Sequence, residues 1–311
     1  MSTKLVSVMT PCYNEEANVR ELYQRIKAVF DALPGYRYEH IFIDNASKDG
    51  TVAVLRELAA ADPNVKVIVN ARNFGHLRSP HHALLQTSGE AVIALAADLQ
   101  DPPELIPAFI QHWESGRKVV MGVKESSEES LLMYWVRGAY YRLLARIADI
   151  QVVRHATGFG LYDRVVIEQL RKLDDPYPYF RGLMAELGYD TATVPYRQPL
   201  RKRGITSNNF YSLYDLAMLG IVNHSKVPLR LATMLGFGMA TLSFLLALGY
   251  LIAKLLFWDR FGFGLAPILI GFFFLSSVQL AFVGIVGEYI GSIYTQVKGM
   301  PLVVEKERIN W

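Results

Sequence analysis

The chain has 311 residues, of which 51% are hydrophobic, and its 32 basic and 29 acidic residues leave a formal net charge of +3. So slight a basic excess gives no reason to expect a nucleic-acid partner, and it suits a protein that faces anionic lipid. The single cysteine, Cys12, excludes an intramolecular disulfide and a cysteine zinc cluster. The high hydrophobic content indicates that part of the chain belongs to a membrane.

Strands and helices are expected to alternate over the first 125 residues. The expected strands are "LVSVMT", "HIFID", "VKVIVN", "AVIALAA" and "KVVMGV", and the expected helices are "EEANVRELYQRIKAVFDAL", "TVAVLRELAAAD" and "PELIPAFIQHWESG". This alternation predicts an α/β domain whose mostly parallel sheet is covered by helices on both faces. The N-terminal "MSTKLVSVMTP" has too short an apolar stretch for a signal peptide, so we expect this domain in the cytosol.

Polar residues follow the expected strands at the edge where parallel sheets bind ligands. They are Pro11, Tyr13 and Asn14, then Asp44 and Asn45, then Arg72 and Asn73, and finally Asp98, Gln100 and Asp101. Taken singly, such residues have structural explanations, since Asn14 and Thr51 could cap the helices that follow them. Taken together at one edge, they predict a nucleotide site.

Three neighbouring histidines, His76, His81 and His82, raise the alternative of a metal site. Pro80 lies between them and is expected to interrupt any helix that would align them. A polar loop is therefore the favoured interpretation of this stretch.

Two further helical patterns precede the membrane part. Residues 131–153 place arginines among aromatic residues, and residues 209–222 carry an apolar stripe. Both patterns suit the membrane interface. Packing of 131–153 on the core of the domain is an equal alternative.

Two runs without a charged residue, 231–253 and 261–287, exceed the roughly 20 residues that cross a bilayer. They predict a transmembrane hairpin with spans at about 231–253 and 263–287. Basic residues outside the hairpin outnumber those in its short loop, which places both ends in the cytoplasm by the positive-inside rule. The alternative is a pair of very apolar core helices.

Four motifs, read together, identify a resemblance. "P-x-Y-N-E-E", "D-N-A-S-K-D-G-T", "A-D-L-Q-D-P-P-E" and "G-E-Y-I-G-x-I-Y-x-x-V-K-G-x-P" are similar to those of family 2 glycosyltransferases that load sugars onto polyprenyl phosphate. The nearest group is the bactoprenol glucosyltransferases, which are related to dolichol-phosphate mannose synthase. The resemblance implies a Rossmann-like GT-A catalytic domain over 1–208, an interfacial helix over 209–228, a hairpin over 229–294 and a cytoplasmic tail over 295–311.

The resemblance also implies site residues. Pro11, Tyr13, Glu15 and Asp44 match positions that bind the nucleoside of a nucleotide sugar, and Asp98 and Gln100 match positions that bind its diphosphate and Mg²⁺ or Mn²⁺. Arg137 and Arg142 resemble the basic residues that receive the lipid phosphate, and with Asp98 they form the expected catalytic set. Arg201, Arg203 and Ser207 belong to a segment that closes over the lipid-phosphate site in relatives.

The polar residues that follow residue 97 are expected to have two different roles. If the segment is extended, Asp98 and Gln100 point the same way and form a metal site with one carboxylate, completed by diphosphate oxygens. Asp101, followed by Pro102 and Pro103, has the spacing of a helix N-cap and is expected to be mainly structural.

Two positions depart from the motifs of the family, since Ala96 and Gly158 stand where relatives often carry carboxylates. A phosphate acceptor is largely dianionic at neutral pH and needs no base, so these losses favour a phosphate nucleophile. Asp163 is an alternative base that the motif alignment does not support.

The implied reaction is an inverting transfer of glucose from UDP-glucose to undecaprenyl phosphate at the cytoplasmic face of a bacterial inner membrane. The alternative donors are GDP-mannose, UDP-GlcNAc and a UDP-modified arabinose. A non-catalytic scaffold that binds sugar nucleotide or lipid phosphate is a further alternative. Two spans and the absence of Q-x-x-R-W argue against a processive polysaccharide synthase. A flippase and a transferase that uses the lipid-linked sugar are the expected downstream partners, and exposed aromatic helices would permit a homo-oligomer.

Overall fold

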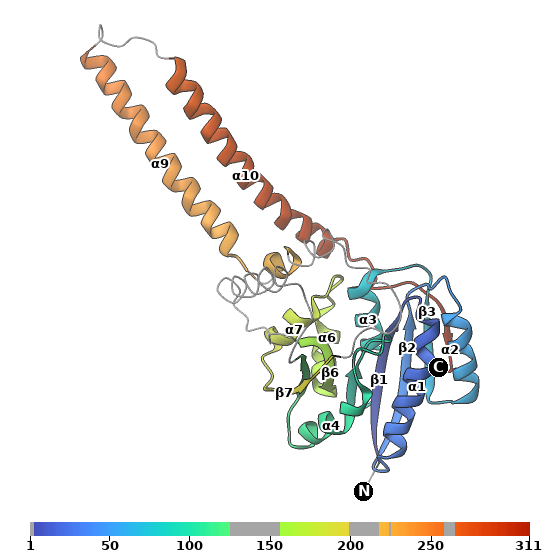
Figure 1. The fold of residues 1–311 in the computed structure, drawn as a ribbon. Coiled ribbons are helices and arrows are strands. Elements are labelled where there is room, and N and C mark those ends of the chain that lie inside the picture. The colour runs from blue at the N-terminus through green and yellow to red at the C-terminus, as the bar shows by residue number, and fades with distance from the viewer. Residues whose placement is uncertain (1–2, 125–155, 199–217, 224, 258–264) are drawn as a thin grey trace.

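The computed structural model describes residues 3–124, 156–198, 218–223, 225–257 and 265–311 (Figure 1). The strands are β1 (Lys4–Cys12), β2 (Tyr36–Asp44), β3 (Val65–Asn70), β4 (Ala91–Ala94), β5 (Val119–Lys124), β6 (Ala156–Asp163), β7 (Thr191–Tyr196) and β8 (Glu305–Ile309). The helices are α1 (Glu16–Asp31), α2 (Thr51–Ala61), α3 (Gly75–Leu85), the 3₁₀ turn η1 (Pro103–Leu105), α4 (Ile106–Glu114), α6 (Arg164–Leu173), α7 (Phe180–Leu187), α9 (Val227–Leu256) and α10 (Leu265–Val297).

One sheet organises the domain, with the strand order β7-β5-β6-β4-β1-β2-β3-β8. Strands β4, β1, β2 and β3 are parallel neighbours, and β5 is parallel to β7. Strand β6 runs antiparallel to both β4 and β5, and β8 runs antiparallel to β3. The predicted α/β fold with a mostly parallel sheet is confirmed.

Helices cover both faces of the sheet and enclose two apolar layers. Helices α1, α2 and α4 bury their apolar stripes on one face, and α3, α6 and α7 bury theirs on the other. Neighbouring side chains on β2 alternate between the two layers, with Phe42 in the first and Ile41 and Ile43 in the second. Burial on both faces explains why these parallel strands are continuous apolar runs.

The expected loop around Pro80 is wrong, because Gly75–Leu85 is one helix with Pro80 inside it. A proline within a helix removes one backbone hydrogen bond and crowds the preceding turn. Pro80 is the sixth residue of α3, just past the four amide groups that have no intrahelical acceptor, so the bond that it removes lies near the start of the ladder. Burial of Ala83 and Leu84 against the sheet then holds the helix in place.

The C-terminal segment returns to the sheet as the edge strand β8. Arg56 on α2 binds the carboxylate of Glu307 through two nitrogens, at 2.5 and 2.6 Å. The Asn310 side-chain amide donates to the carbonyls of Ala59 and Val65, at 2.6 and 3.0 Å. The last residues of the chain are therefore part of the domain.

Helices α9 and α10 lie side by side and project from the domain (Figure 1). Within the described residues, these two are long and apolar enough to cross a membrane. Large apolar side chains such as Phe237 and Phe273 are 72% and 64% exposed on them. Apolar exposure on this scale suggests association with a membrane. The exact boundaries of the spans stay predictions.

Candidate active site

The carboxyl ends of β1 and β2 form the first part of the site. Asp44 ends β2 beside Cys12 of β1 in the parallel register, and it is fully buried. Its Oδ2 accepts the Ser47 amide at 3.0 Å, whereas its buried Oδ1 has no hydrogen-bond partner among the described residues. Burial raises the pKa of Asp44. A buried acceptor atom without a protein partner is suited to accept a hydrogen bond from a ligand.

Two expected helix caps, Asn14 and Thr51, instead join the two loops that follow β1 and β2. The Asn14 amide donates to Ser47 Oγ at 2.9 Å, and Asn14 Oδ1 accepts the Lys48 amide at 2.8 Å. Thr51 Oγ1 accepts the Glu15 amide at 2.9 Å. Asn14 adopts a φ of 56°, a left-handed backbone that cannot begin a helix. The capping predictions are therefore wrong.

The same loops present two predicted nucleoside residues. Tyr13 is 40% exposed, so its ring is open to a ligand. Glu15 is buried and accepts from the Asn18 side-chain amide at 2.6 Å. The structure thus brings Tyr13, Glu15 and Asp44 to one edge of the sheet.

A tight turn carries Asp98 and Gln100 beyond β4, and the expectation of an extended segment is wrong. Leu99 has a φ of 60°, and Asp98 Oδ1 accepts the Gln100 amide at 3.2 Å. A left-handed leucine costs on the order of 1–3 kcal/mol and is held only by its surroundings, here by burial of the Leu99 side chain. Strain of this kind is typical of functional sites.

Asp101 does not cap a helix, contrary to the expectation. Its Oδ1 accepts the Tyr196 hydroxyl at 2.9 Å, and its Oδ2 accepts the Ala96 amide at 3.3 Å. Burial raises the pKa of Asp101 to about 6. The spacing that suggested a cap was misleading because the partner of this carboxyl comes from β7, far away in the sequence.

A cavity of about 260 Å³ opens beside these turns. Its lining comes from β1 (Met9, Pro11), the end of β4 and the residues after it (Ala94, Leu95, Ala96, Asp101), α3 (His76, Leu77, Pro80, His81, Leu84), β6 (Gly158, Phe159), and the start of α7 with the two residues before it (Pro178, Tyr179, Phe180, Arg181). Both positions that lack a family carboxylate, Ala96 and Gly158, are in this wall. Asp101 is the carboxyl group that the described residues bring to it.

Sequence reasoning missed the contribution of α3 and of Arg181 to this cavity. His81 is buried, and its Nδ1 has no hydrogen-bond partner in the described part of the chain. Burial lowers the pKa of His81 to about 4, so the imidazole is neutral near pH 7. The sequence did indicate that α3 would lie near the cavity, because α3 closely follows Arg72 and Asn73 at the ligand-binding edge.

Asp163 directly precedes α6, and its carboxylate is already hydrogen-bonded to other protein groups. It accepts from Trp113 Nε1 at 2.8 Å and Lys118 Nζ at 2.9 Å, and it caps α6 by accepting the Val165 amide at 2.9 Å. It is not among the described residues that line the cavity. The geometry gives no support to Asp163 as a base.

Five predicted site residues lie outside the described residues, so their predicted roles stay predictions: Arg137, Arg142, Arg201, Arg203 and Ser207. In the portions that are described, no group of three or more His, Cys, Asp or Glu side chains is placed to hold a metal ion.

The sequence profile of glycosyl transferase family 2 matches residues 7–171. The chain is 35% identical over 299 residues to the uncharacterized glycosyltransferase YkcC of Bacillus subtilis, with 96% of this chain and 92% of the relative covered. It is 33% identical over 303 residues to the SfII prophage-derived bactoprenol glucosyl transferase of Shigella flexneri, with 97% of each covered. The solved structure of glucosyl-3-phosphoglycerate synthase from Mycobacterium tuberculosis with Mn²⁺, UDP and phosphoglyceric acid is 20% identical, with a TM-score of 0.48 and coverage of 70% of this chain and 76% of that one.

Proposed function

Because this chain belongs to glycosyl transferase family 2 and is a glycosyltransferase with a Rossmann-like GT-A fold, we propose that it transfers glucose from UDP-glucose to undecaprenyl phosphate. One observation carries the proposal. The similarity to a bactoprenol glucosyl transferase covers 97% of both chains, so it includes the apolar helices as well as the catalytic domain.

The nucleoside of the donor would bind at the ends of β1 and β2. The unpartnered Oδ1 of Asp44 would accept a hydrogen bond from the nucleoside, and the exposed ring of Tyr13 would lie against the base. Glu15 and Pro11 complete this part of the proposed site. Its loops are tied to each other through Asn14 and Thr51, so the site is formed before the donor arrives.

Asp98 and Gln100 would hold Mg²⁺ or Mn²⁺ together with the donor diphosphate. Carboxylate and amide oxygens suit either ion, and Asp98 is only partly buried in its turn, so the residues fit such a site. Since Asp98 already accepts the Gln100 amide through Oδ1, its contribution is a single carboxylate arm. The bound ion would neutralise the charge of the leaving diphosphate.

The acceptor phosphate would attack the anomeric carbon of the donor with inversion. A phosphate monoester has its second pKa near 6, so it reaches the site as a nucleophile that needs no base. This agrees with a cavity wall in which Gly158 and Ala96 carry no carboxylate and Asp101 is engaged by Tyr196. Arg137 and Arg142, which match the family's lipid-phosphate residues, would orient the acceptor, and Arg201, Arg203 and Ser207 would close over it.

The hairpin would place this reaction at the cytoplasmic face of the inner membrane. Helices α9 and α10 would cross the bilayer, and the interfacial segments would keep the cavity near the headgroup of the acceptor. A lipid-linked sugar made on this face must be moved across the membrane and then consumed by another transferase, which defines the downstream partners.

The proposal is tested by incubating the purified full-length protein with undecaprenyl phosphate and one donor at a time, with and without chelator. The donors are UDP-glucose, GDP-mannose, UDP-GlcNAc and a UDP-modified arabinose, and the product is identified by mass spectrometry. A single glucosylated lipid, lost with chelator, is expected. Product from another donor would correct the sugar, and no lipid product from any donor would reject sugar transfer in favour of the binding scaffold.

Asp98→Ala is expected to lower the transfer rate at least 100-fold, because the leaving diphosphate loses its metal ligand. Asp31→Ala is the matched control, since this carboxylate is exposed on α1 and pairs with Lys27. Both variants should unfold at the temperature of the wild type within a few degrees. Full activity of Asp98→Ala would contradict the assignment.

A further inference from the structure

Helix α3 carries two stripes of side chains with different partners. Leu77, Pro80, His81 and Leu84 line the cavity, and their spacing of three and four residues places them on one side of the helix. Arg78 and His82, with Gln86 at the C-cap of α3, are spaced by four residues and form a neighbouring stripe. The second stripe contacts the C-terminal segment of the chain.

The contacts of this second stripe run along the length of α3. Arg78 Nη2 donates to the Pro301 carbonyl at 2.5 Å, and His82 Nε2 lies 2.5 Å from Glu305 Oε1. At the end of the helix, Arg308 Nη2 donates to Gln86 Oε1 at 2.9 Å. These contacts join residues more than 200 positions apart in the sequence.

The C-terminal segment is itself fixed to the domain. Strand β8 pairs with β3, the Ala71 amide donates to the Val304 carbonyl at 2.8 Å, and Val303 is buried. Helix α10 ends at Val297, only four residues before Pro301. The segment therefore connects the second apolar helix to α3 through a short and well-anchored stretch.

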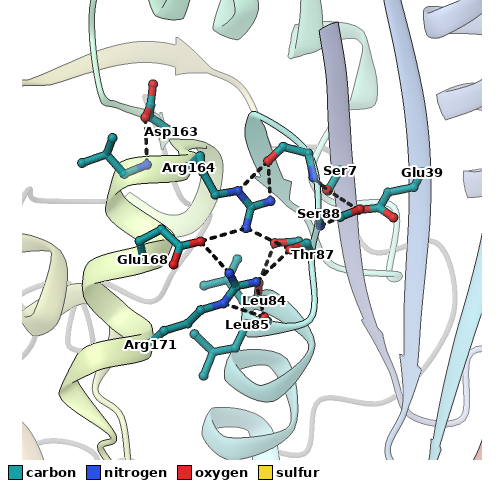
Figure 2. Close-up of polar contacts among 12 residues, drawn as sticks. Ser7, Glu39, Leu84, Leu85, Thr87, Ser88, Asp163, Arg164, Glu168 and Arg171 are labelled. Atoms are coloured by element: carbon teal, nitrogen blue, oxygen red, sulfur yellow. Dashed lines mark hydrogen bonds and ion pairs between the residues drawn. The ribbon is translucent and has the colours of Figure 1, made fainter. Parts of the chain in front are cut away.

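The far end of α3 is held separately, by two arginines of α6 (Figure 2). Arg164 donates to the carbonyls of Thr87 and Gly89, and Arg171 donates to those of Leu85 and Thr87. These carbonyls follow or end α3, so α6 fixes where the helix stops. It does not contact the stripe formed by Arg78 and His82 in any interaction among the described residues.

We propose that Arg78 and His82 are positioning residues, which hold α3 in its place as a cavity wall by binding Pro301 and Glu305. The position of α10 relative to the domain is thereby coupled to the shape of the cavity in which the sugar donor reacts. This inference rests on the proposed function, because it assumes that transfer takes place in this cavity. Displacement of a wall by even 1 Å is enough to slow a reaction that depends on alignment about 100-fold.

Glu305→Ala tests the coupling, and Glu307→Ala is its matched control. Both substitutions remove a carboxylate from β8, but Glu305 contacts His82 on α3 as well as Arg308 on β8 itself, whereas Glu307 contacts Arg56 on α2. Helix α2 does not contribute a described residue to the cavity. Glu305→Gln keeps an oxygen that can accept from His82 and serves as the conservative variant. The full-length proteins are compared in lipid nanodiscs with undecaprenyl phosphate and UDP-glucose.

We expect Glu305→Ala to lower kcat/KM for transfer about tenfold relative to Glu307→Ala, with most of the loss recovered in Glu305→Gln. The Kd for UDP should stay within about twofold of the wild-type value, since the predicted nucleoside residues lie at or just after the ends of β1 and β2 and not on α3. Hydrogen exchange of the α3 amides should be faster in Glu305→Ala than in Glu307→Ala. A purely structural role of β8 would affect the two alanine variants alike.

Equal kcat/KM for the two alanine variants would overturn the inference. Unchanged hydrogen exchange of α3 in Glu305→Ala would also overturn it, and this measurement needs no turnover. Absence of transfer by the wild-type protein would instead reject the proposed function, and the exchange of α3 would then decide the inference alone.

Discussion

The two glycines of β6 are required for different physical reasons. Gly158 has a φ of 97°, a conformation that side chains with a Cβ rarely adopt, and it forms part of the cavity wall. Gly160 lies where a Cβ would come within 2.2 Å of the Val120 carbonyl oxygen on β5. Between them, Phe159 packs on Phe109 with ring centroids 4.9 Å apart. The close approach of β5 and β6 therefore depends on Gly160, and the backbone path along the cavity depends on Gly158.

Gly160→Ala is expected to destabilise the protein by about 1–3 kcal/mol, because β5 must move to admit the methyl group. Thermal unfolding of the purified protein measures the effect. Gly35→Ala is the control, since nothing lies within 4 Å of a Cβ at that position, and it should change stability little. Equal unfolding temperatures for the two variants would contradict the close approach of the strands.

The buried imidazole of His81 should make the free energy of unfolding depend on pH. Burial lowers its folded-state pKa to about 4 from an ordinary value near 6.5, so the unfolded state binds more protons between these values. The contribution of the neutral His81 to the free energy of unfolding is fully present above pH 6.5. It is lost as the pH falls toward 4, which lowers the free energy of unfolding by up to about 3 kcal/mol. His81→Gln should therefore show a smaller decrease in unfolding temperature over this range than the wild type. The buried His40 titrates in the same sense in both proteins, so the difference isolates His81.

At the scale of elements, α3 depends on donors supplied by α6. The last carbonyls of a helix have no amide partner within it, and cations near this end are favoured by the helix dipole. Arg171 Nε donates to the last carbonyl of α3, at Leu85, at 3.0 Å, and Arg164 Nη1 donates to the Thr87 carbonyl just beyond it at 2.9 Å (Figure 2). Arg164 Nε also donates to the Gly89 carbonyl at 2.7 Å. One planar guanidinium thus satisfies the turn between α3 and β4.

Arg164→Lys is expected to cost about 1–3 kcal/mol, because an ammonium group cannot reproduce the two-pronged contact and leaves a partly buried carbonyl without a donor. The free energy of unfolding is obtained from denaturant titration. Lys172→Arg, an exposed change on the same helix, is the control and should be close to neutral. A cost no larger than that of the control would show that water replaces the guanidinium.

Periodicity predicted most of the first half of the fold, since β1 to β5, α1, α2 and α4 all follow their hydrophobic patterns. It failed at α3, where tertiary packing outweighs the proline, and it did not predict β6, α6, α7, β7 or β8. The sequence "EKERI" of β8 is charged because it forms an edge strand, where charges discourage further pairing, and so it lacks the pattern of a buried strand.

The site shows the same division between local and long-range causes. The gathering of Tyr13 and Asp44 followed from strand ends, which are a property of parallel topology, and Glu15 was added by the resemblance to the family. The left-handed Leu99 and the bond between Asp101 and Tyr196 did not, because each depends on contacts with distant residues. Local spacing therefore predicted the edge of the sheet at which these residues meet, but not the backbone at Leu99 or the hydrogen-bond partner of Asp101.

At the scale of the whole molecule, the chain leaves the domain, forms the two apolar helices and returns to the same sheet (Figure 1). Strand β8 lies beside β3, so the segment that follows α10 ends on the same side of the hairpin as the domain. If α9 and α10 span a bilayer, the domain and β8 must lie on one side of it, and the end of α9 at Leu256 and the start of α10 at Leu265 must lie toward the other.

Cysteine labelling of cells that express the full-length protein tests this topology. Cys12 is the one cysteine of the chain, and burial raises its pKa well above the ordinary value, so the wild-type protein should not react with a maleimide. Asp259→Cys, between the two apolar runs, should react with a membrane-impermeant maleimide in spheroplasts. Lys306→Cys, exposed on β8, should react only after the membrane is opened. Labelling of both variants in closed spheroplasts, or of Asp259→Cys only after opening, would exclude a hairpin with a cytoplasmic domain, because the two positions are then on the same face or the orientation is reversed.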